Sequence, residues 1–227
     1  MPMAEPGAAA ARSSADAPAR TVRRQQLIDA AIASISEHGL SRTTVSKVAE
    51  AAGLSQGIVN FYFKSKEALL LATLEHVESE FERVRRAALA RAGNTPERRL
   101  DAIVEATFDP SVCNPRFTAV WNAFWGEASA RADYMRVCAG REVAELEETL
   151  TLFRAIAKRE RQPHVDAEAL GTAFFHLLES IPEPFDPVER YDLEGAKRIC
   201  RAFLSSVFPA TFALAKGARR SARRGTQ

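Results

Sequence analysis

Small polar and basic side chains crowd the stretch from residue 43 to residue 66. The amides of Gln56 and Asn60 can form paired hydrogen bonds with the edge of adenine, and the Ser55 hydroxyl can bond to several bases. Hydroxyl and ammonium groups suit phosphate contacts, which orient a protein on DNA without reading its sequence. The residues expected to contact DNA are Thr43, Thr44, Ser55, Gln56, Gly57, Asn60, Tyr62, Lys64 and Lys66.

Two short helices and the turn between them must position these side chains. Thr43 is expected to cap the second helix of the chain, Gly53 to make the turn, and Ser55 to cap a third helix that ends near Tyr62. This layout is a helix-turn-helix, with the motif spanning Thr44 to Phe63. The second helix of such a motif lies in the major groove of DNA.

A glycine inside so short a helix needs a reason. A bulky side chain at Gly57 would hold the backbone away from the groove, so the glycine favours close approach to DNA. The neighbouring aromatic residues are expected to divide. Phe61 and Phe63 should pack against the first and fourth helices, while Tyr62 faces phosphate together with the lysines.

The rest of the chain has the apolar spacing of helices and no convincing alternation of the strand period, which predicts an all-α protein. The segment "PEPFDP", residues 182–187, is expected to be a rigid connection without helix. The expected helices cover residues 22–38, 43–52, 55–62, 65–93, 95–108, 114–128, 132–159, 166–181 and 192–208.

Length and charge divide the chain into unequal parts. The 227 residues are 46% hydrophobic and carry a net charge of only +2, but residues 65–215 hold 19 basic against 24 acidic side chains. A basic front and an acidic body suggest that the front binds a polyanion. We expect a disordered tail over 1–20, a DNA-binding domain over 21–64, an effector-binding and dimerisation domain over 65–215, and a basic disordered tail over 216–227.

Signs of an enzyme are missing from the sequence. The four histidines have no metal-ligand spacing, and no nucleophile elbow, P-loop or dinucleotide fingerprint occurs. Three scattered cysteines favour reduced thiols in a cytosolic protein. No signal peptide or membrane span is apparent, so we expect a cytoplasmic protein without a cofactor.

The stretch "TTVSKVAEAAGLSQGIVNFYFKSKEAL" resembles the N-terminal signature of TetR-type repressors. The resemblance lies in Ala-Gly, an apolar residue, Ser-x-Gly, and then "YF-x-x-K-x-x-L". Asn60 departs from the tyrosine that this family often has, so it is where the DNA preference of this protein is expected to differ.

Two further segments resemble one group in this family, the choline-responsive betaine-operon repressors (the BetI group). They are "RRQQLIDA" at residues 23–30 and "AVWNAFWGEA" at residues 119–128, the latter followed by Tyr134, Arg136 and Arg141. This resemblance covers about residues 23–160, and the C-terminal third is expected to depart from the group.

The resemblance implies a homodimeric repressor. Its first three helices would bind double-stranded operator DNA, and the helices at 167–181 and 193–207 would pair in the dimer. Each recognition helix would read one half-site, about 34–36 Å from the other. Choline would release the protein from DNA, in a switch between two states.

A choline site would need aromatic faces, because a quaternary ammonium group donates no hydrogen bond and binds by cation–π attraction. Glu127 or Glu179 could add negative charge. An aromatic stripe at helical spacing is also typical of an ordinary core, and this alternative stays open for each residue. The candidates for the ligand site are Phe108, Trp121, Phe124, Trp125, Tyr134, Phe174, Phe175 and Glu179.

Two other hypotheses remain from the sequence. The same scaffold could sense a drug, a lipid or another metabolite. A helical scaffold that binds only proteins is the other, and salt-dependent binding to duplex DNA would exclude it.

Overall fold

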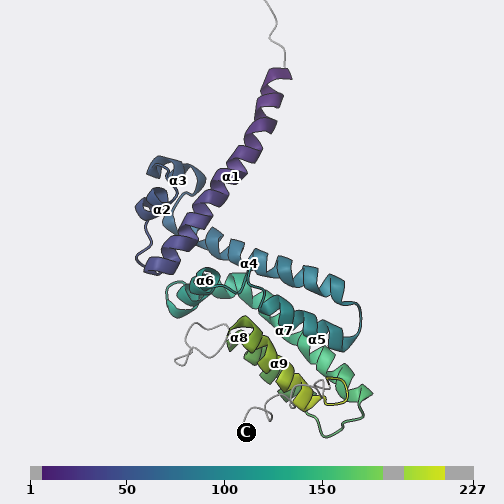
Figure 1. The fold of residues 1–227 in the computed structure, drawn as a ribbon. Coiled ribbons are helices and arrows are strands. Elements are labelled where there is room, and N and C mark those ends of the chain that lie inside the picture. The colour runs from purple at the N-terminus through teal and green to yellow at the C-terminus, as the bar shows by residue number, and fades with distance from the viewer. Residues whose placement is uncertain (1–6, 181–191, 213–227) are drawn as a thin grey trace, which may run out of the picture. The chain divides into compact units, whose positions relative to one another are not determined.

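Figure 1 shows the protein as a computed structural model that describes residues 7–180 and 192–212, with side chains from residue 20 onward. These residues form helices and contain no strand, which confirms the all-α prediction. The helices are α1 (Gly7–His38), α2 (Val45–Ala51), α3 (Gln56–Tyr62), α4 (Lys66–Ala92), α5 (Pro96–Thr107), α6 (Pro115–Gly126), α7 (Arg131–Arg159), α8 (Ala167–Ser180) and α9 (Leu193–Val207).

The chain folds as two compact units, to which α4 and α7 both contribute. Unit 1 comprises Met1–Val77 and Pro115–Met135, and unit 2 comprises Glu78–Asn114 and Arg136–Gln227. Among the described residues, no helix is both long and apolar enough to cross a membrane. The expected connection at 182–187 and the basic tail at 216–227 lie outside the described residues.

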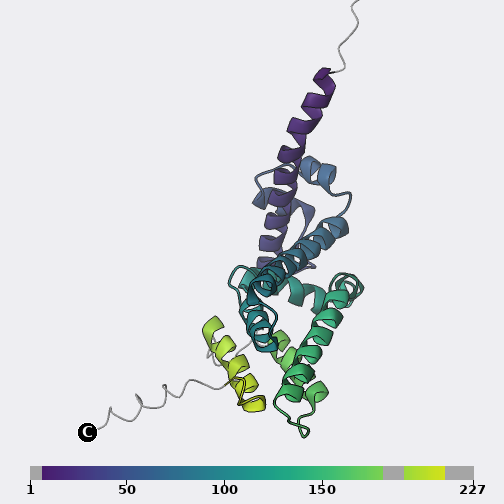
Figure 2. The same ribbon diagram turned by 90° about the vertical axis from the view of Figure 1, so that its right-hand side faces the viewer.

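Helix α1 begins at Gly7, whereas the sequence predicts a start near Val22 and disorder over residues 1–20. The difference follows from the many alanines before residue 20, because alanine has the highest helix propensity. In Figures 1 and 2, α1 extends well beyond α2 and α3.

Unit 1 is built around the apolar face of α1, which packs against α2 and α6. The predicted stripe of Leu27, Ile28, Ala31 and Ile35 is buried, with exposed fractions between 0 and 2%. Since these positions recur every three or four residues, they lie on one face of the helix. This face is the support on which the helix-turn-helix rests.

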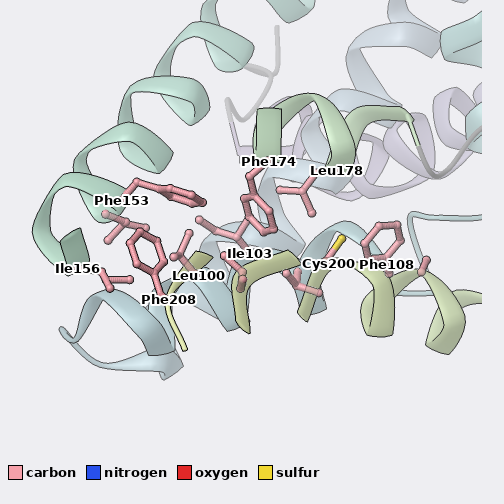
Figure 3. Packing of buried hydrophobic residues seen from close by; sticks show 13 residues of the cluster. Leu100, Ile103, Phe108, Phe153, Ile156, Phe174, Leu178, Cys200 and Phe208 are labelled. Carbon is pink, nitrogen blue, oxygen red and sulfur yellow. The ribbon is translucent and has the colours of Figure 1, made fainter. Parts of the chain in front are cut away.

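Unit 2 has a hydrophobic core with side chains from α5, α7, α8 and α9 (Figure 3). Three phenylalanines lie at its centre. The ring centroid of Phe153 is 5.2 Å from that of Phe208 and 5.6 Å from that of Phe174. Such tilted and edge-to-face contacts are favourable beyond the area that they bury.

Several helices begin where the sequence predicts a capping side chain. Ser65 Oγ accepts a hydrogen bond from the Ala68 N–H at 3.1 Å. Asp192 Oδ1 accepts one from the Gly195 N–H at 2.6 Å. Each bond satisfies a backbone donor that the first turn of a helix leaves free.

Buried ion pairs join α7 to the unit 2 part of α4. Arg141 on α7 binds Glu78 on α4 and Glu145 one turn along α7, each at 2.5 Å. Its guanidinium carbon lies 4.8 Å from the centroid of the Phe81 ring. Arg85 on α4 binds Glu145 at 3.0 Å, so the two helices share this carboxylate.

Carboxylates outnumber guanidinium groups in this network. Loss of hydration raises the pKa of Glu78 and Glu145, although Arg141 opposes the shift. On α8, loss of hydration raises the pKa of Glu179 to about 7. The positive charge of Arg141 opposes this rise in pKa. Repulsion from three carboxylates adds to it, namely those of Glu145, Glu142 and Glu78. Glu179 keeps an exposed surface, so water screens part of this repulsion. The network comprises Glu78, Glu142, Glu145, Glu148 and Glu179 with Arg85, Arg99 and Arg141.

The raised pKa of Glu179 predicts a pH-dependent stability. A carboxyl with a higher pKa in the folded than in the unfolded state binds more protons when folded, so its contribution to stability falls as pH rises between these values. For Glu179 this window runs from 4.5 to about 7. Glu179→Gln lacks this titration. Its unfolding free energy minus that of the wild type, measured by urea titration, should therefore rise as pH increases across this window.

The matched control for this experiment is Glu147→Gln, which removes an exposed carboxylate from α7. Its unfolding free energy relative to wild type should change little with pH. A difference between Glu179→Gln and wild type that stays constant across the window would contradict the prediction.

Candidate nucleic-acid interface and effector residues

The turn after α2 has a backbone conformation that suits glycine. Gly53 has a φ of 64°, in the left-handed region. Its N–H donates to the Glu50 carbonyl at 3.0 Å, and the Leu54 N–H donates to the Ala49 carbonyl at 2.9 Å. These two hydrogen bonds end α2 and turn the chain, and α3 begins directly after the turn.

One side of α3 is anchored in unit 1. Ser55 Oγ accepts a hydrogen bond from the Ile58 N–H at 3.4 Å and caps the helix as predicted. Val59 is 1% exposed, and Phe63, directly after the helix, is 5% exposed. These two residues are four positions apart, so they lie on the same side and fix the rotation of α3 about its axis.

The opposite side of α3 is open and polar. Ser55, Gln56, Gly57 and Asn60 are exposed. Neither Gln56 nor Asn60 forms a side-chain hydrogen bond within the described part of the chain. Their amide groups are therefore available to a partner, and their chemistry suits the edges of bases in the major groove.

No internal contact requires glycine at position 57. A Cβ added to Gly57 would have Ser55 Oγ, at 3.8 Å, as its nearest neighbour, which is ordinary van der Waals contact. Its φ also lies outside the positive region. The folded protein would thus accept a side chain here, so its own packing does not explain the glycine.

The predicted cap of α2 is wrong by one residue. Thr44 is the N-cap, and its Oγ1 accepts a hydrogen bond from the Lys47 N–H at 3.3 Å. Thr43 is 1% exposed, and its hydroxyl donates to the Gly39 carbonyl at 2.9 Å. Thr43 therefore supports the loop between α1 and α2 from inside, and DNA cannot reach it, whereas Thr44 is exposed.

The basic candidates border α3 on its C-terminal side. Lys64 is exposed, and Tyr62 and Lys66 are half-buried. Lys66 Nζ donates to the Ser41 carbonyl at 3.1 Å, and Ser41 Oγ donates to Glu127 Oε2 at 3.0 Å. Lys66 is thereby held close to the α1–α2 loop, so of the two lysines Lys64 is the more freely available to phosphate.

Phe61 is not a core residue, which corrects the expectation for it. It is 65% exposed, and its ring meets the Tyr62 ring edge-on with centroids 5.2 Å apart. The sequence does contain the signal for this position. Because Phe61 is four residues after Gly57 and two before Phe63, a helix places it with Gly57 and away from Phe63.

Half of the effector candidates lie in unit 1, namely Trp121, Phe124, Trp125 and Tyr134. Phe124 is buried, whereas Trp125 is 52% exposed and meets the Tyr134 ring at a centroid distance of 5.3 Å. The guanidinium carbon of Arg131 lies 5.3 Å from the Trp125 centroid. The Trp125 ring thus attracts a cation in the way that it would attract a quaternary ammonium group.

The other effector candidates, Phe108, Phe174, Phe175 and Glu179, lie in unit 2. Phe108 and Phe174 are fully buried in the hydrophobic core (Figure 3), and the Phe174 ring stacks on Phe203 with centroids 5.7 Å apart. Phe175 is 8% exposed. Core packing, the alternative left open by the sequence, therefore accounts for Phe108 and Phe174, while Glu179 belongs to the carboxylate network.

Two family descriptions match the chain. Residues 27–73 match "Bacterial regulatory proteins, tetR family", and residues 96–209, half of the chain, match "BetI-type transcriptional repressor, C-terminal". The second match continues beyond residue 160, so the expected departure of the C-terminal third from this group is wrong.

Curated relatives agree with these matches over a shorter length. The chain is 42% identical over 109 residues to the HTH-type transcriptional regulator BetI of Burkholderia thailandensis, covering 48% of this chain and 56% of that protein. The protein of the same name from Serratia proteamaculans is 41% identical over 108 residues, 47% of this chain and 54% of its own. The chain thus spans about half the length of the curated relatives it matches.

Solved structures share the fold at low sequence identity. A transcriptional regulator from Pseudomonas aeruginosa PAO1 has a TM-score of 0.69 at 24% identity, covering 85% of this chain and 93% of that one. A regulator from Saccharomonospora viridis, solved in complex with choline, has a TM-score of 0.67 at 17% identity, covering 82% and 96%.

The tetR match lies within unit 1, whereas the BetI-type match covers much of unit 2 together with residues 115–135 of unit 1. The tetR match includes α2, α3 and the turn between them, and the BetI-type match runs from α5 to α9. Members of both groups regulate transcription and are not enzymes. The chain therefore belongs to the tetR family of bacterial regulatory proteins and has the C-terminal domain of BetI-type transcriptional repressors.

Proposed function

We propose that the protein is a homodimeric repressor that binds operator DNA through α3 and leaves it when choline binds. Its target genes would be those that convert choline to glycine betaine. The BetI-type match over residues 96–209 carries this proposal, because this part of the chain would hold the effector. Helices α8 and α9 would form the dimer, and the twofold axis would give an operator with two related half-sites.

The polar face of α3 supports the DNA-binding part of the proposal. Gln56 and Asn60 are one helical turn apart and exposed, and their amides bond to no other described side chain. An amide that has both a donor and an acceptor free can read adenine through two hydrogen bonds. Lys64, next to this face, would add a phosphate contact.

Replacing either amide should weaken operator binding without unfolding the protein. Asn60→Ala and Gln56→Ala should each cost about 1–3 kcal/mol of binding free energy, and each should relax specificity at the base pair that it reads. Fluorescence anisotropy with a labelled operator measures the affinity. Asn122→Ala, which removes an exposed amide from α6, is the control. Unaltered affinity in both test variants would refute α3 as the reading surface.

Gly57 permits a test that separates folding from DNA binding. Alanine is a better helix former, so Gly57→Ala should raise the unfolding free energy by about 0.5–1 kcal/mol. The added methyl group meets no protein atom closer than 3.8 Å, but it would face the groove and weaken operator binding. Urea unfolding and anisotropy measure the two effects.

Gly140→Ala is the matched control for this experiment. It lies within α7, is exposed, and has no atom within 4 Å of an added Cβ. It should stabilise the protein similarly and leave DNA affinity unchanged. Equal operator binding by Gly57→Ala and Gly140→Ala would show that the glycine does not face DNA.

A cationic effector suits the chemistry of both units. In unit 1, Trp125 presents its ring to the guanidinium group of Arg131, and the Tyr134 ring lies against Trp125. In unit 2, carboxylates outnumber arginines around Arg141. Aromatic faces and carboxylates both attract quaternary ammonium groups. The choline bound by the S. viridis protein, which shares the fold, is consistent with this class of ligand.

Choline should release the protein from its operator. In an anisotropy titration, saturating choline should weaken DNA binding, whereas 3,3-dimethyl-1-butanol, its uncharged analogue, should not. Trp121→Ala should lose the response while the protein stays folded and its operator affinity without choline stays unchanged. Unchanged operator binding at saturating choline would remove choline as the effector.

A different small molecule is the alternative effector within the same family. Choline, glycine betaine, hydrophobic cations and fatty acids should be compared in one thermal-shift experiment, because a ligand that prefers the folded state raises the melting temperature. A shift with one of these and none with choline would keep the repressor and change its signal.

A further inference from the structure

Two arginines of α1 lie against the aromatic residues at the end of α3. The guanidinium carbon of Arg20 is 5.2 Å from the centroid of the Phe61 ring, and that of Arg24 is 5.3 Å from the centroid of Phe63. Because residues 20 and 24 are one turn apart, they lie on the same face of α1. This face of α1 therefore borders the reading helix.

The two arginine–aromatic pairs differ in burial. Phe63 belongs to the core of unit 1, so Arg24 covers a packed residue. Phe61 is 65% exposed and Arg20 is exposed as well, so this pair contributes little to the core.

The electrostatics of this pair favour an anion as its partner. Arg20 forms no salt bridge within the described residues, and residues 17–28 contain three arginines and no acidic residue. The guanidinium group of Arg20 donates no hydrogen bond to another described residue. Its N–H donors, which lie in the plane of that group, stay free for two parallel bonds to a phosphate.

We propose that the exposed ring of Phe61 at the end of α3 supports Arg20 of α1, so that the Arg20 guanidinium group binds a backbone phosphate beside the base pairs read by α3. This inference rests on the proposed DNA-binding function. Arg20 would add affinity that does not depend on sequence, and Phe61 would act as its positioning residue.

The test is the salt dependence of DNA binding by the full-length protein. Arg20→Ala should reduce the magnitude of the slope of log K against log salt by about 1.8 for the dimer, since each protomer loses one phosphate contact worth about 0.9, and should weaken binding by about tenfold per contact at 0.1 M salt. The loss should be equal for operator and for unrelated duplex DNA. Arg20→Lys keeps the charge and should retain most of the slope.

Arg86→Ala is the matched control, because Arg86 is an exposed arginine of α4 in unit 2 and its loss changes the net charge equally. It should keep the wild-type slope. Phe61→Leu keeps apolar volume but removes the ring, so it should weaken binding in the same direction. The double variant Arg20→Ala/Phe61→Leu should bind DNA no more weakly than Arg20→Ala. If Phe61 had a role of its own in binding, the double variant would bind more weakly than Arg20→Ala.

The outcomes separate this inference from the proposed function. Equal slopes for Arg20→Ala and Arg86→Ala, in a protein whose operator binding still depends on Asn60, would overturn the role of Arg20 alone. A loss confined to operator DNA with an unchanged slope would overturn it too, because base reading would then replace phosphate binding. A wild-type protein that binds no duplex DNA would overturn the proposed function itself.

Discussion

The left-handed turn at Gly53 is the constraint on which the arrangement of the reading surface depends. Two backbone hydrogen bonds close α2 there, and the direction in which the chain leaves the turn places Val59 and Phe63 in the core of unit 1. Once these two residues are buried, the helical period determines which side chains face outward. Gln56, Gly57, Asn60 and Phe61 are therefore exposed because of a backbone feature that precedes all of them.

Much of this arrangement could be predicted from the sequence, because it depends on local rules. The buried stripe of α1 and the caps at Ser55 and Ser65 follow from spacing and residue type. Thr43 and Thr44 differ only in tertiary contacts, since both can cap a helix and only packing decides which is buried. The ligand candidates could not be sorted from sequence either, because helical spacing describes a core and an aromatic cage equally well. Only the packing in the structure shows that Phe108 and Phe174 are core residues.

Charge is divided between the two units in a way that total composition conceals. Arg20 and Lys64, close to α3, form no salt bridge within the described residues, whereas around Arg141 several carboxylates compete for a few guanidinium groups. Buried ion pairs gain little net stability, because desolvation offsets much of their attraction. Such a network responds strongly when its charge changes. A bound cation or proton would therefore alter the contact between α4 and α7 more than it would alter an apolar seam.

The length of α3 has a consequence of its own. A helix of seven residues is too short to be stable in water on its own. Helix α3 is therefore stabilised by its Ser55 cap and by the buried side chains of Val59 and Phe63. Segments held by so few contacts open at a lower free energy than the domain around them. A small shift that exposed Val59 and Phe63 to water would unfold α3. The exposed face of α3 would then be lost while the rest of unit 1 stays folded.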